Sequence, residues 1–405
     1  MKKNLFNGLM LAALFLASAG LTSCLNDDDE TIVLETPSTG IPDDSQATAN
    51  PEIPSGSTTT TIPNVQTTVD YVNGVPVIRI DMTGIKNTGD TDWMRLYGTG
   101  YSNQNVWVEV DGQPKGILVY NNADDAGTEN IPVDIVFTVD NSTSMSEEAD
   151  KLAKEILSWT TLLSNSKLDA KFGVVGYGRS VGSQYPYLVD GYGVSGALDL
   201  TSRDNLNAYL NRSSVSGVDR TVGYEGSNKD RLSTAANNYS KSGGECGVQA
   251  IRFADENFAF RTKANRIYVN FTDDANYTGL NNSISVEYMA SESIWPAAKG
   301  TIHSVISNTE YSIINRVNKI GGAELPWLLS EYTGGTIKYA SPDFSDVTLA
   351  DLPVTGAMEN SYIIRFTNIG DLIDDGKTHL VHITVYSKDG KVRADKTFWV
   401  TFVSK

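Results

Sequence analysis

Cysteine is almost absent from this chain: Cys24 and Cys246 are the two cysteines among 405 residues. Histidine is also scarce, with three residues, and the 32 lysines and arginines are outnumbered by 49 aspartates and glutamates, giving a net charge of −17. With so few cysteines, stability must come from ordinary apolar cores. The acidic balance argues against nucleic acid as a partner, because phosphate binding requires clustered lysine and arginine.

The start of the chain has no apolar run of membrane-spanning length. Two lysines precede the apolar stretch Leu9 to Leu16, which is too short to cross a bilayer and predicts a signal peptide over residues 1–23. The next residues, Leu21-Thr22-Ser23-Cys24, resemble the bacterial lipobox, which implies that Cys24 carries a lipid anchor in the membrane. An ordinary secretory signal with an incidental cysteine is the alternative.

An acidic run and a polar segment follow the lipobox. The run Asn26 to Glu30 resembles the surface-export signal of Bacteroidetes lipoproteins, which implies an outer-membrane protein displayed at the cell surface; a solvated spacer is the alternative. Threonine, serine and proline then dominate to Thr68, with few large apolar residues. Such a composition buries too little surface to order itself, so residues 24–68 are predicted to be a flexible stalk.

Two blocks of alternating apolar residues lie at either end of the remaining chain, over residues 69–130 and 341–405. In the first, Ile78, Ile80 and Met82 share one face, and in the second Val381 and Ile383 do the same. Neither block has enough strands to be stable alone. We therefore expect the two blocks to pair into one all-β sandwich.

Between these blocks, residues 131–340 alternate strand and helix patterns, which predicts an α/β domain with a doubly wound parallel sheet inserted in the sandwich. Residues 181–243 are rich in glycine and serine and are expected to form loops over the sheet edge. The expected strands are 170–177, 266–272, 301–307 and 336–340, and the expected helices are 246–260, one ending near 299, and 325–332.

The residues that follow the first strand of this domain suggest a metal site. The apolar strand ends at Asp140, and hydroxyls follow at Ser142 and Ser144. Alternate residues of an extended turn point the same way, so one carboxylate and two hydroxyls can face a common point. Oxygen ligands of this kind suit a hard divalent cation, expected to be Mg²⁺, with Mn²⁺ or Ca²⁺ as alternatives.

This Asp-x-Ser-x-Ser pattern resembles the metal-ion-dependent adhesion site (MIDAS) of von Willebrand factor A domains. Thr272-Asp273, at the end of a later apolar strand, is similar to the strand-Thr-Asp element of that family, and the resemblance implies that Asp273 is a further ligand. It also implies a doubly wound, Rossmann-like fold. In this family, a carboxylate of a protein ligand completes the metal coordination.

The remaining ligand and a second metal are less clearly marked. Glu245, before a predicted helix, resembles a ligand position of integrin β subunits; Ser242, or a glutamate that only favours the helix dipole, are the alternatives. Glu147 and Glu148 occupy the places where integrin β has acids for an adjacent metal. A first-turn interaction with the helix dipole, after a cap at Ser144, explains them equally well.

Two patterns compete with this interpretation. Gly178-x-Ser180-x-Gly182 matches the nucleophile motif of α/β hydrolases, but proline and loop residues follow where a helix should begin. The three histidines lie in or beside strands and are interpreted as structural. Cys246 is interpreted as a small buried apolar residue. We therefore expect no enzyme, with hydrolysis through Ser180 as a minor alternative.

Together these features predict a surface lipoprotein that binds a protein partner through a divalent metal, with a role in adhesion. The alternative is a structural or assembly subunit of a surface complex or fimbrial tip, in which the α/β domain is only a packing module.

Overall fold

The computed structural model describes residues 39–52, 55–87, 92–122, 131–146, 148–164, 168–180, 191–212, 220–279, 281–346 and 348–404. The expected signal peptide, Cys24, the acidic run and Glu147 lie outside these ranges. Within the described ranges, no helix combines the length and the apolar character needed to cross a membrane.

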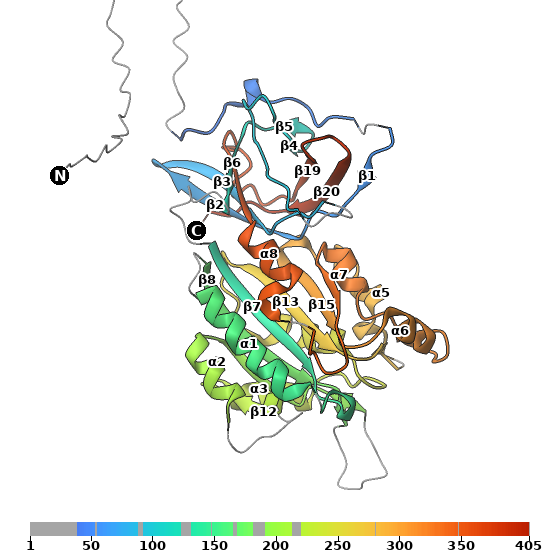
Figure 1. The fold of residues 1–405 in the computed structure, drawn as a ribbon. Coiled ribbons are helices and arrows are strands. Elements are labelled where there is room, and N and C mark those ends of the chain that lie inside the picture. Colours follow the sequence, from blue (N-terminus) through green and yellow to red (C-terminus); the bar gives the residue numbers. More distant parts are fainter. Residues whose placement is uncertain are drawn as a thin grey trace, which may run out of the picture. The chain divides into compact units, whose positions relative to one another are not determined.

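The chain outside the α/β block forms two β-sheets (Figure 1). One has the order β2-β3-β18-β6 and the other β1-β20-β19-β4-β5. Strands from before and after the α/β block are neighbours in both sheets, since β18 pairs with β3 and β6, and β19 pairs with β4. The strands are β1 Thr58–Thr59, β2 Val65–Val72, β3 Val75–Met82, β4 Val106–Val110, β5 Gln113–Pro114, β6 Ile117–Asn121, β18 Tyr362–Phe366, β19 His379–Tyr386 and β20 Val392–Val400.

The alternating residues of these strands fill one apolar core. Ile80, Ile364 and Ile383 belong to it and are fully buried. The turn between β2 and β3 is made by Asn73 and Gly74, both with positive φ (52° and 80°), as a tight hairpin requires. The predicted fold class, an α/β domain inserted in an all-β sandwich, is confirmed.

The segment before β2 differs from the flexible stalk expected from its composition. From residue 39 onward it packs on the sandwich: Ile41 and Ile62 are each 1% exposed, and Thr58 and Thr59 pair with β20. The stalk prediction does not hold for the described part of residues 39–68. Composition shows how little apolar surface a segment carries, but not that a neighbouring sheet offers partners to the few apolar side chains it has.

The α/β block is built on a sheet of order β12-β11-β8-β7-β13-β15-β17. β7 is parallel to β8 on one side and to β13 on the other, while β11 runs antiparallel to β8. The carboxyl ends of β7, β8 and β13 therefore meet at the topological switch point of the sheet. The strands are β7 Ile131–Asp140, β8 Leu168–Tyr177, β11 Gly196–Thr201, β12 Gly223–Glu225, β13 Asn265–Thr272, β15 Thr301–Ile306 and β17 Ile337–Tyr339, with short pairs β9 Arg179–Ser180 and β10 Tyr192–Gly193, β14 Asn276–Tyr277 and β16 Ala323–Glu324.

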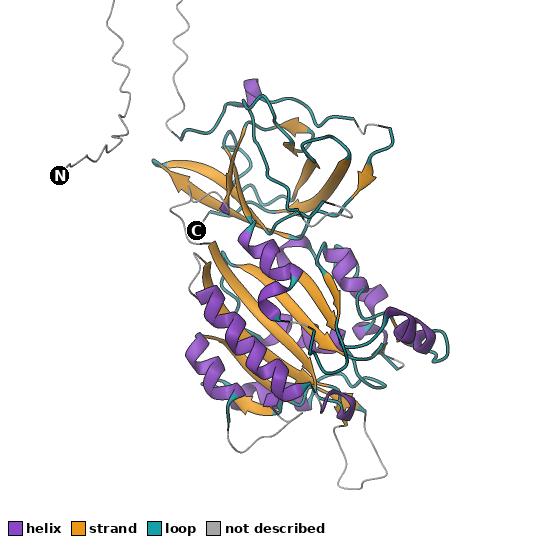
Figure 2. Cartoon of the chain, viewed as in Figure 1, coloured by secondary structure: helices purple, strands orange, loops and turns teal. Residues whose placement is uncertain are grey.

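Helices cover both faces of this sheet (Figure 2). Successive residues of β7 point to opposite faces: Phe137 packs with Trp159 of α1, and Val136 belongs to the core under α4. This explains why β7 is apolar at almost every position. The helices are α1 Ala149–Ser164, α2 Arg203–Leu210, α3 Lys229–Asn237, α4 Gly247–Asn257, α5 Val286–Met289, α6 Glu310–Val317, α7 Leu328–Thr333 and α8 Pro353–Glu359.

Two expectations about this block are wrong. The excursion 181–243 contains strands β10, β11 and β12 and helices α2 and α3, because residues such as Leu206 and Leu232 give its polar sequence buried helix faces. The helix expected to end near 299 is a 3-10 turn, Ala297–Lys299, preceded by the single-turn helix α5.

The boundary at residue 340 also differs. The residues just beyond it, including α8, pack against α1: Val354 and Met358 belong to the core of α1, and the Trp159 indole donates to Thr355 Oγ1 at 2.7 Å. The pattern missed this because α8 has only two turns and follows a polar stretch.

We predict that Ile364→Ala lowers the free energy of unfolding by about 2–5 kcal/mol, because it empties a fully buried position in β18 between β3 and β6. Hydrogen exchange should accelerate in β3, far upstream in sequence. Val403→Ala, at a position that is 58% exposed, is the control and should change stability by less than about 0.5 kcal/mol. Unchanged exchange in β3 would contradict the shared core.

Candidate metal centre

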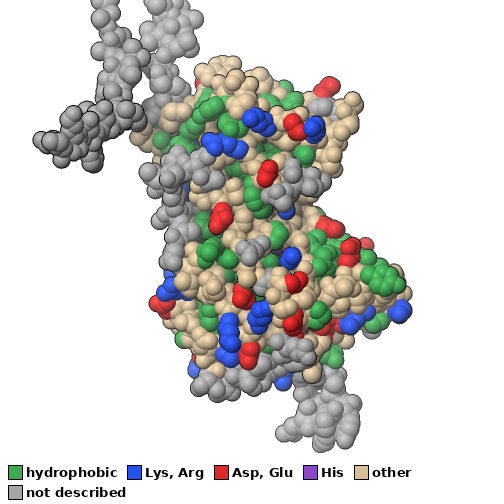
Figure 3. Space-filling view, in the orientation of Figure 1, with side chains coloured by type: hydrophobic (Ala, Val, Ile, Leu, Met, Phe, Trp, Pro, Cys, Tyr) green, Lys and Arg blue, Asp and Glu red, His purple; other side chains and the backbone are tan. Residues whose placement is uncertain are grey.

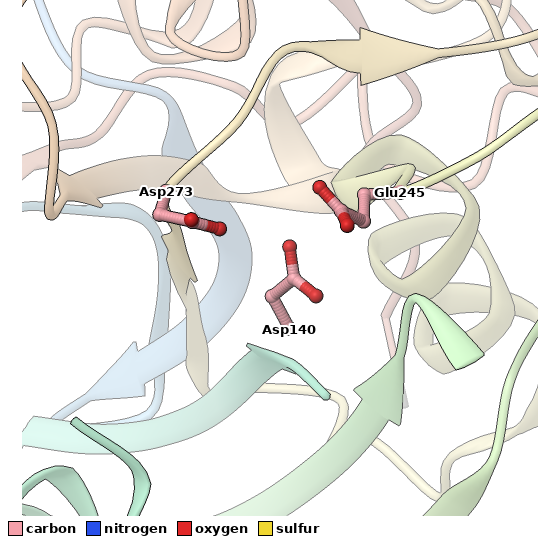
Figure 4. A group of neighbouring side chains, drawn as sticks. All are labelled: Asp140, Glu245 and Asp273. Carbon is pink, nitrogen blue, oxygen red and sulfur yellow. The ribbon is translucent and has the colours of Figure 1, made fainter. Parts of the chain in front are cut away.

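Three carboxylates meet at the switch point of the α/β sheet. Asp140 ends β7, Asp273 follows β13, and Glu245 lies directly before the N-cap of α4. An oxygen of each lies within 4.8 Å of the others, and Figure 4 shows all three carboxylates converging. The structure therefore brings Asp140 together with two residues that are more than a hundred positions further along the chain.

Asp140 is held by hydrogen bonds on both oxygens. Its Oδ1 accepts from the Ser142 backbone N–H at 2.8 Å, and its Oδ2 accepts from Thr272 Oγ1 at 3.0 Å. Thr272 is in place because β13 runs parallel to β7, with Phe271 opposite Val139. Asp140 is 1% exposed, so these bonds define the orientation of its carboxylate.

The two serines link Asp140 to Asp273. Ser142 Oγ lies 2.9 Å from Ser144 Oγ, and Ser144 Oγ donates to Asp273 Oδ1 at 3.1 Å. Ser144 belongs to a 3-10 turn, Thr143–Ser146, and α1 begins only at Ala149, so the predicted helix cap at Ser144 is wrong. Its hydroxyl faces the acidic group instead.

Of the alternatives for the remaining ligand, Glu245 is the residue that reaches the cluster. Ser242 Oγ donates to two backbone carbonyls, those of Tyr192 at 3.2 Å and Gly244 at 2.7 Å. Glu245 Oε2 is buried and has no hydrogen-bond partner among the described residues. A buried carboxylate oxygen without a donor costs free energy, and a cation is the kind of ligand that would offset this cost.

The pKa values of the three acids reflect this crowding. Burial, followed by the charge of neighbouring acids, raises the pKa of Asp140 to about 7 and that of Glu245 to about 9. Burial also raises the pKa of Asp273. Three close carboxylates repel one another when ionised, and a divalent cation relieves that repulsion. The donor set, all oxygen and mostly anionic, fits a hard divalent metal.

Gly178 leaves space for this cluster and was not recognised from the sequence as part of it. It follows β8 with φ +79°, and a Cβ there would lie 2.4 Å from Asp140 Oδ1 and 3.3 Å from Glu245 Cγ. The first glycine of the apparent hydrolase motif is thus explained by the carboxylates beside it. Ser180 lies in the short strand β9, which pairs with β10. The sequence did carry a signal for this role, because Gly178 directly follows the predicted strand 170–177.

Further polar and charged side chains lie around Asp273. Asp274, next to Asp273, forms an ion pair with Arg316 of α6 and accepts from the Tyr277 hydroxyl at 3.0 Å. Asn308 Nδ2 donates to the backbone carbonyl of Asp273 at 2.9 Å. Arg316, which is partly exposed, therefore places a positive charge close to the acidic cluster.

For the adjacent metal considered at Glu147 and Glu148, the structure describes only Glu148. Glu148 is buried and accepts from Ser307 Oγ at 2.9 Å; it does not belong to the acidic cluster. His303 is also buried, with its pKa lowered to about 3, and accepts from the Thr336 N–H. Burial raises the pKa of Cys246 to about 12, so its thiol stays protonated.

No protein-family model and no curated protein matches this sequence. Among solved structures, the chain is similar to proximal thread matrix protein 1 from the mussel byssus, whose MIDAS motif is occupied by zinc, at 13% identity and a TM-score of 0.34 over 61% of this chain and 49% of the mussel protein. It thus spans about half of that protein's length.

The chain is also similar to the conserved hypothetical protein BatB from Bacteroides thetaiotaomicron, at 17% identity and a TM-score of 0.29, over 52% of this chain and 90% of that one. A third similar structure is the human COPII-coat protein Sec24c, at 9% identity and a TM-score of 0.34, over 89% of this chain and 62% of that one.

The raised pKa values predict a pH-dependent stability of the metal-free protein. Because an acid with a raised pKa in the folded state holds its proton longer than in the unfolded state, the free energy of unfolding should fall as pH rises from about 4 towards about 9. Glu245→Gln should therefore stabilise the metal-free protein at about pH 8, by roughly 1–3 kcal/mol, and much less at about pH 4.

Denaturant unfolding at several pH values measures this effect. Glu359→Gln removes a charge from an exposed position of α8 and serves as the control, with no pH-dependent gain expected. A Glu245→Gln protein that is no more stable than the wild type at alkaline pH would contradict the crowding of ionised carboxylates.

Proposed function

We propose that this chain is a cell-surface lipoprotein whose α/β domain binds a protein partner through one divalent cation. The observation that carries the proposal is the convergence of Asp140, Glu245 and Asp273, joined by the hydroxyls of Ser142 and Ser144, at the switch point where α/β sheets bind ligands. The shell contains only oxygen, which favours Mg²⁺, or Mn²⁺ or Ca²⁺ in its place.

Each residue of the cluster has a separate task in this proposal. Thr272 and the Ser142 N–H orient Asp140, while Ser144 orients Asp273. Glu245 offers an oxygen, Oε2, that has no hydrogen-bond partner in the described part of the chain. A bound cation would supply a positive charge and a coordination position for an oxygen of the partner. The resemblance to MIDAS domains suggests an acidic side chain of a protein for that role, and Arg316 would add attraction for it.

Display at the cell surface is supported by the sequence. The lipobox before Cys24 and the acidic run behind it resemble those of exported lipoproteins, and the net charge of −17 makes nucleic acid a poor partner. On the face shown in Figure 3, acidic and basic side chains are interspersed. We propose no catalytic activity.

The first test is metal binding. Titration calorimetry with Mg²⁺ and Mn²⁺ should give one site in the wild type, and Asp140→Ala or Asp273→Ala should abolish detectable binding because each removes a carboxylate next to the cation. Thr272→Val, which removes only the hydroxyl that orients Asp140, should weaken binding about 10–100-fold. Glu359→Gln should bind like the wild type.

Unchanged binding in both aspartate variants, or no binding in the wild type, would contradict the metal proposal. The α/β domain would then serve as a packing module in a surface assembly, which is the second candidate function.

A second test uses two glycines with similar backbone conformations. Gly178 and Gly100 have φ of +79° and +88°, so an alanine at either position costs roughly 1–2 kcal/mol in backbone strain. The Cβ at Gly178 collides with Asp140, whereas nothing lies within 4 Å at Gly100. Gly178→Ala should lose metal binding, and Gly100→Ala should keep it. Equal metal affinities in the two variants would show that the space beside Asp140 is not needed.

A further inference from the structure

The half-buried Lys396 and the buried Asn64 form an unusual pair between the two sheets of the sandwich. Lys396 lies in β20, on the same face as the buried Ala394 and Phe398, and Asn64 directly precedes β2. The Lys396 Nζ lies 2.5 Å from Asn64 Oδ1. β20 and β2 belong to different sheets, so the pair connects the two layers.

Asn64 is held in one orientation towards the lysine. It is 6% exposed, its Nδ2 donates to the Gly300 carbonyl at 2.8 Å, and its backbone N–H donates to the Thr333 carbonyl at 2.9 Å. With Nδ2 occupied in this way, the carbonyl side of the amide faces Lys396. The Lys396 Nζ has one further acceptor, the Ile62 carbonyl at 3.4 Å.

The surroundings favour an uncharged amine. Burial lowers the pKa of Lys396 to about 8, and the charge of Glu292 only partly opposes this shift. A neutral fraction of the amine is therefore present near neutral pH, with a free electron pair.

We propose that Lys396 and Asn64 form an intramolecular isopeptide bond that joins the two sheets of the sandwich. The neutral Nζ attacks Cγ of Asn64, so that an N–C bond forms and the carbonyl becomes tetrahedral. A proton passes from Nζ to Nδ2; the Cγ–Nδ2 bond then breaks and ammonia leaves. One amide replaces another, so the reaction requires no oxidant, reductant or further reactant.

Such a bond would supply a covalent cross-link that no disulfide among the described residues can provide. The described residues contain one cysteine, Cys246, which is free and buried in the α/β domain. A covalent link between the start of β2 and β20 would close a loop that contains the whole inserted domain, and restricting the unfolded chain in this way stabilises the folded state. The sandwich would then resist separation of its sheets.

Peptide mapping of the unfolded wild-type protein tests the bond directly. Cleavage after acidic residues should release residues 53–70, which contain Asn64, attached to residues 396–405, which begin with Lys396. The branched peptide should weigh one ammonia less than the sum of its two linear parts. Linear peptides alone in the wild type would overturn the proposal and leave an ordinary hydrogen bond.

Two variants sharpen the test. Asn64→Asp should give a branched peptide of the same mass as the wild type, because loss of water from aspartate and loss of ammonia from asparagine produce the same amide. Lys396→Arg should give only linear peptides, and a branched peptide in this variant would place the link elsewhere.

Discussion

The parallel pairing of β7 with β8 on one side and β13 on the other is the constraint on which the candidate metal centre depends. It puts Asp140 and Asp273 at neighbouring strand ends and places Thr272 where its hydroxyl meets Asp140. The strands are buried on both faces, so their register cannot shift without exposing apolar side chains. The carboxylates are thus held close together by the core beneath them, despite their mutual repulsion.

At the switch point, the features that suit metal binding lower the stability of the metal-free protein. Three partly or fully buried acids make the switch point costly for the protein alone, and one of their oxygens has no hydrogen-bond partner among the residues that the structure describes. The same features make it suited to a hard divalent cation. Strain of this kind persists where the rest of the fold holds it, and here two helical layers and a seven-stranded sheet do so.

The sandwich depends on contacts between distant parts of the chain, because more than two hundred residues separate its strands β6 and β18. Its two halves share a core made only when β18 enters between β3 and β6. The Lys396–Asn64 pair lies across the two sheets of this sandwich, next to Gly300 and Thr333 of the α/β domain. Cross-linking there would hold the sheets together without contributing to the acidic cluster.

Local pattern determined much of this protein: the alternation of strand and helix, and the placement of Asp140, Ser142, Ser144 and Asp273 at or just after strand ends, could be predicted. Only the tertiary structure decided between Glu245 and Ser242, because both precede α4 and only their directions differ. It also showed the ordered segment before β2, helices α2 and α8, and the role of Gly178. Those features depend on partners distant in sequence, which composition and periodicity do not reveal.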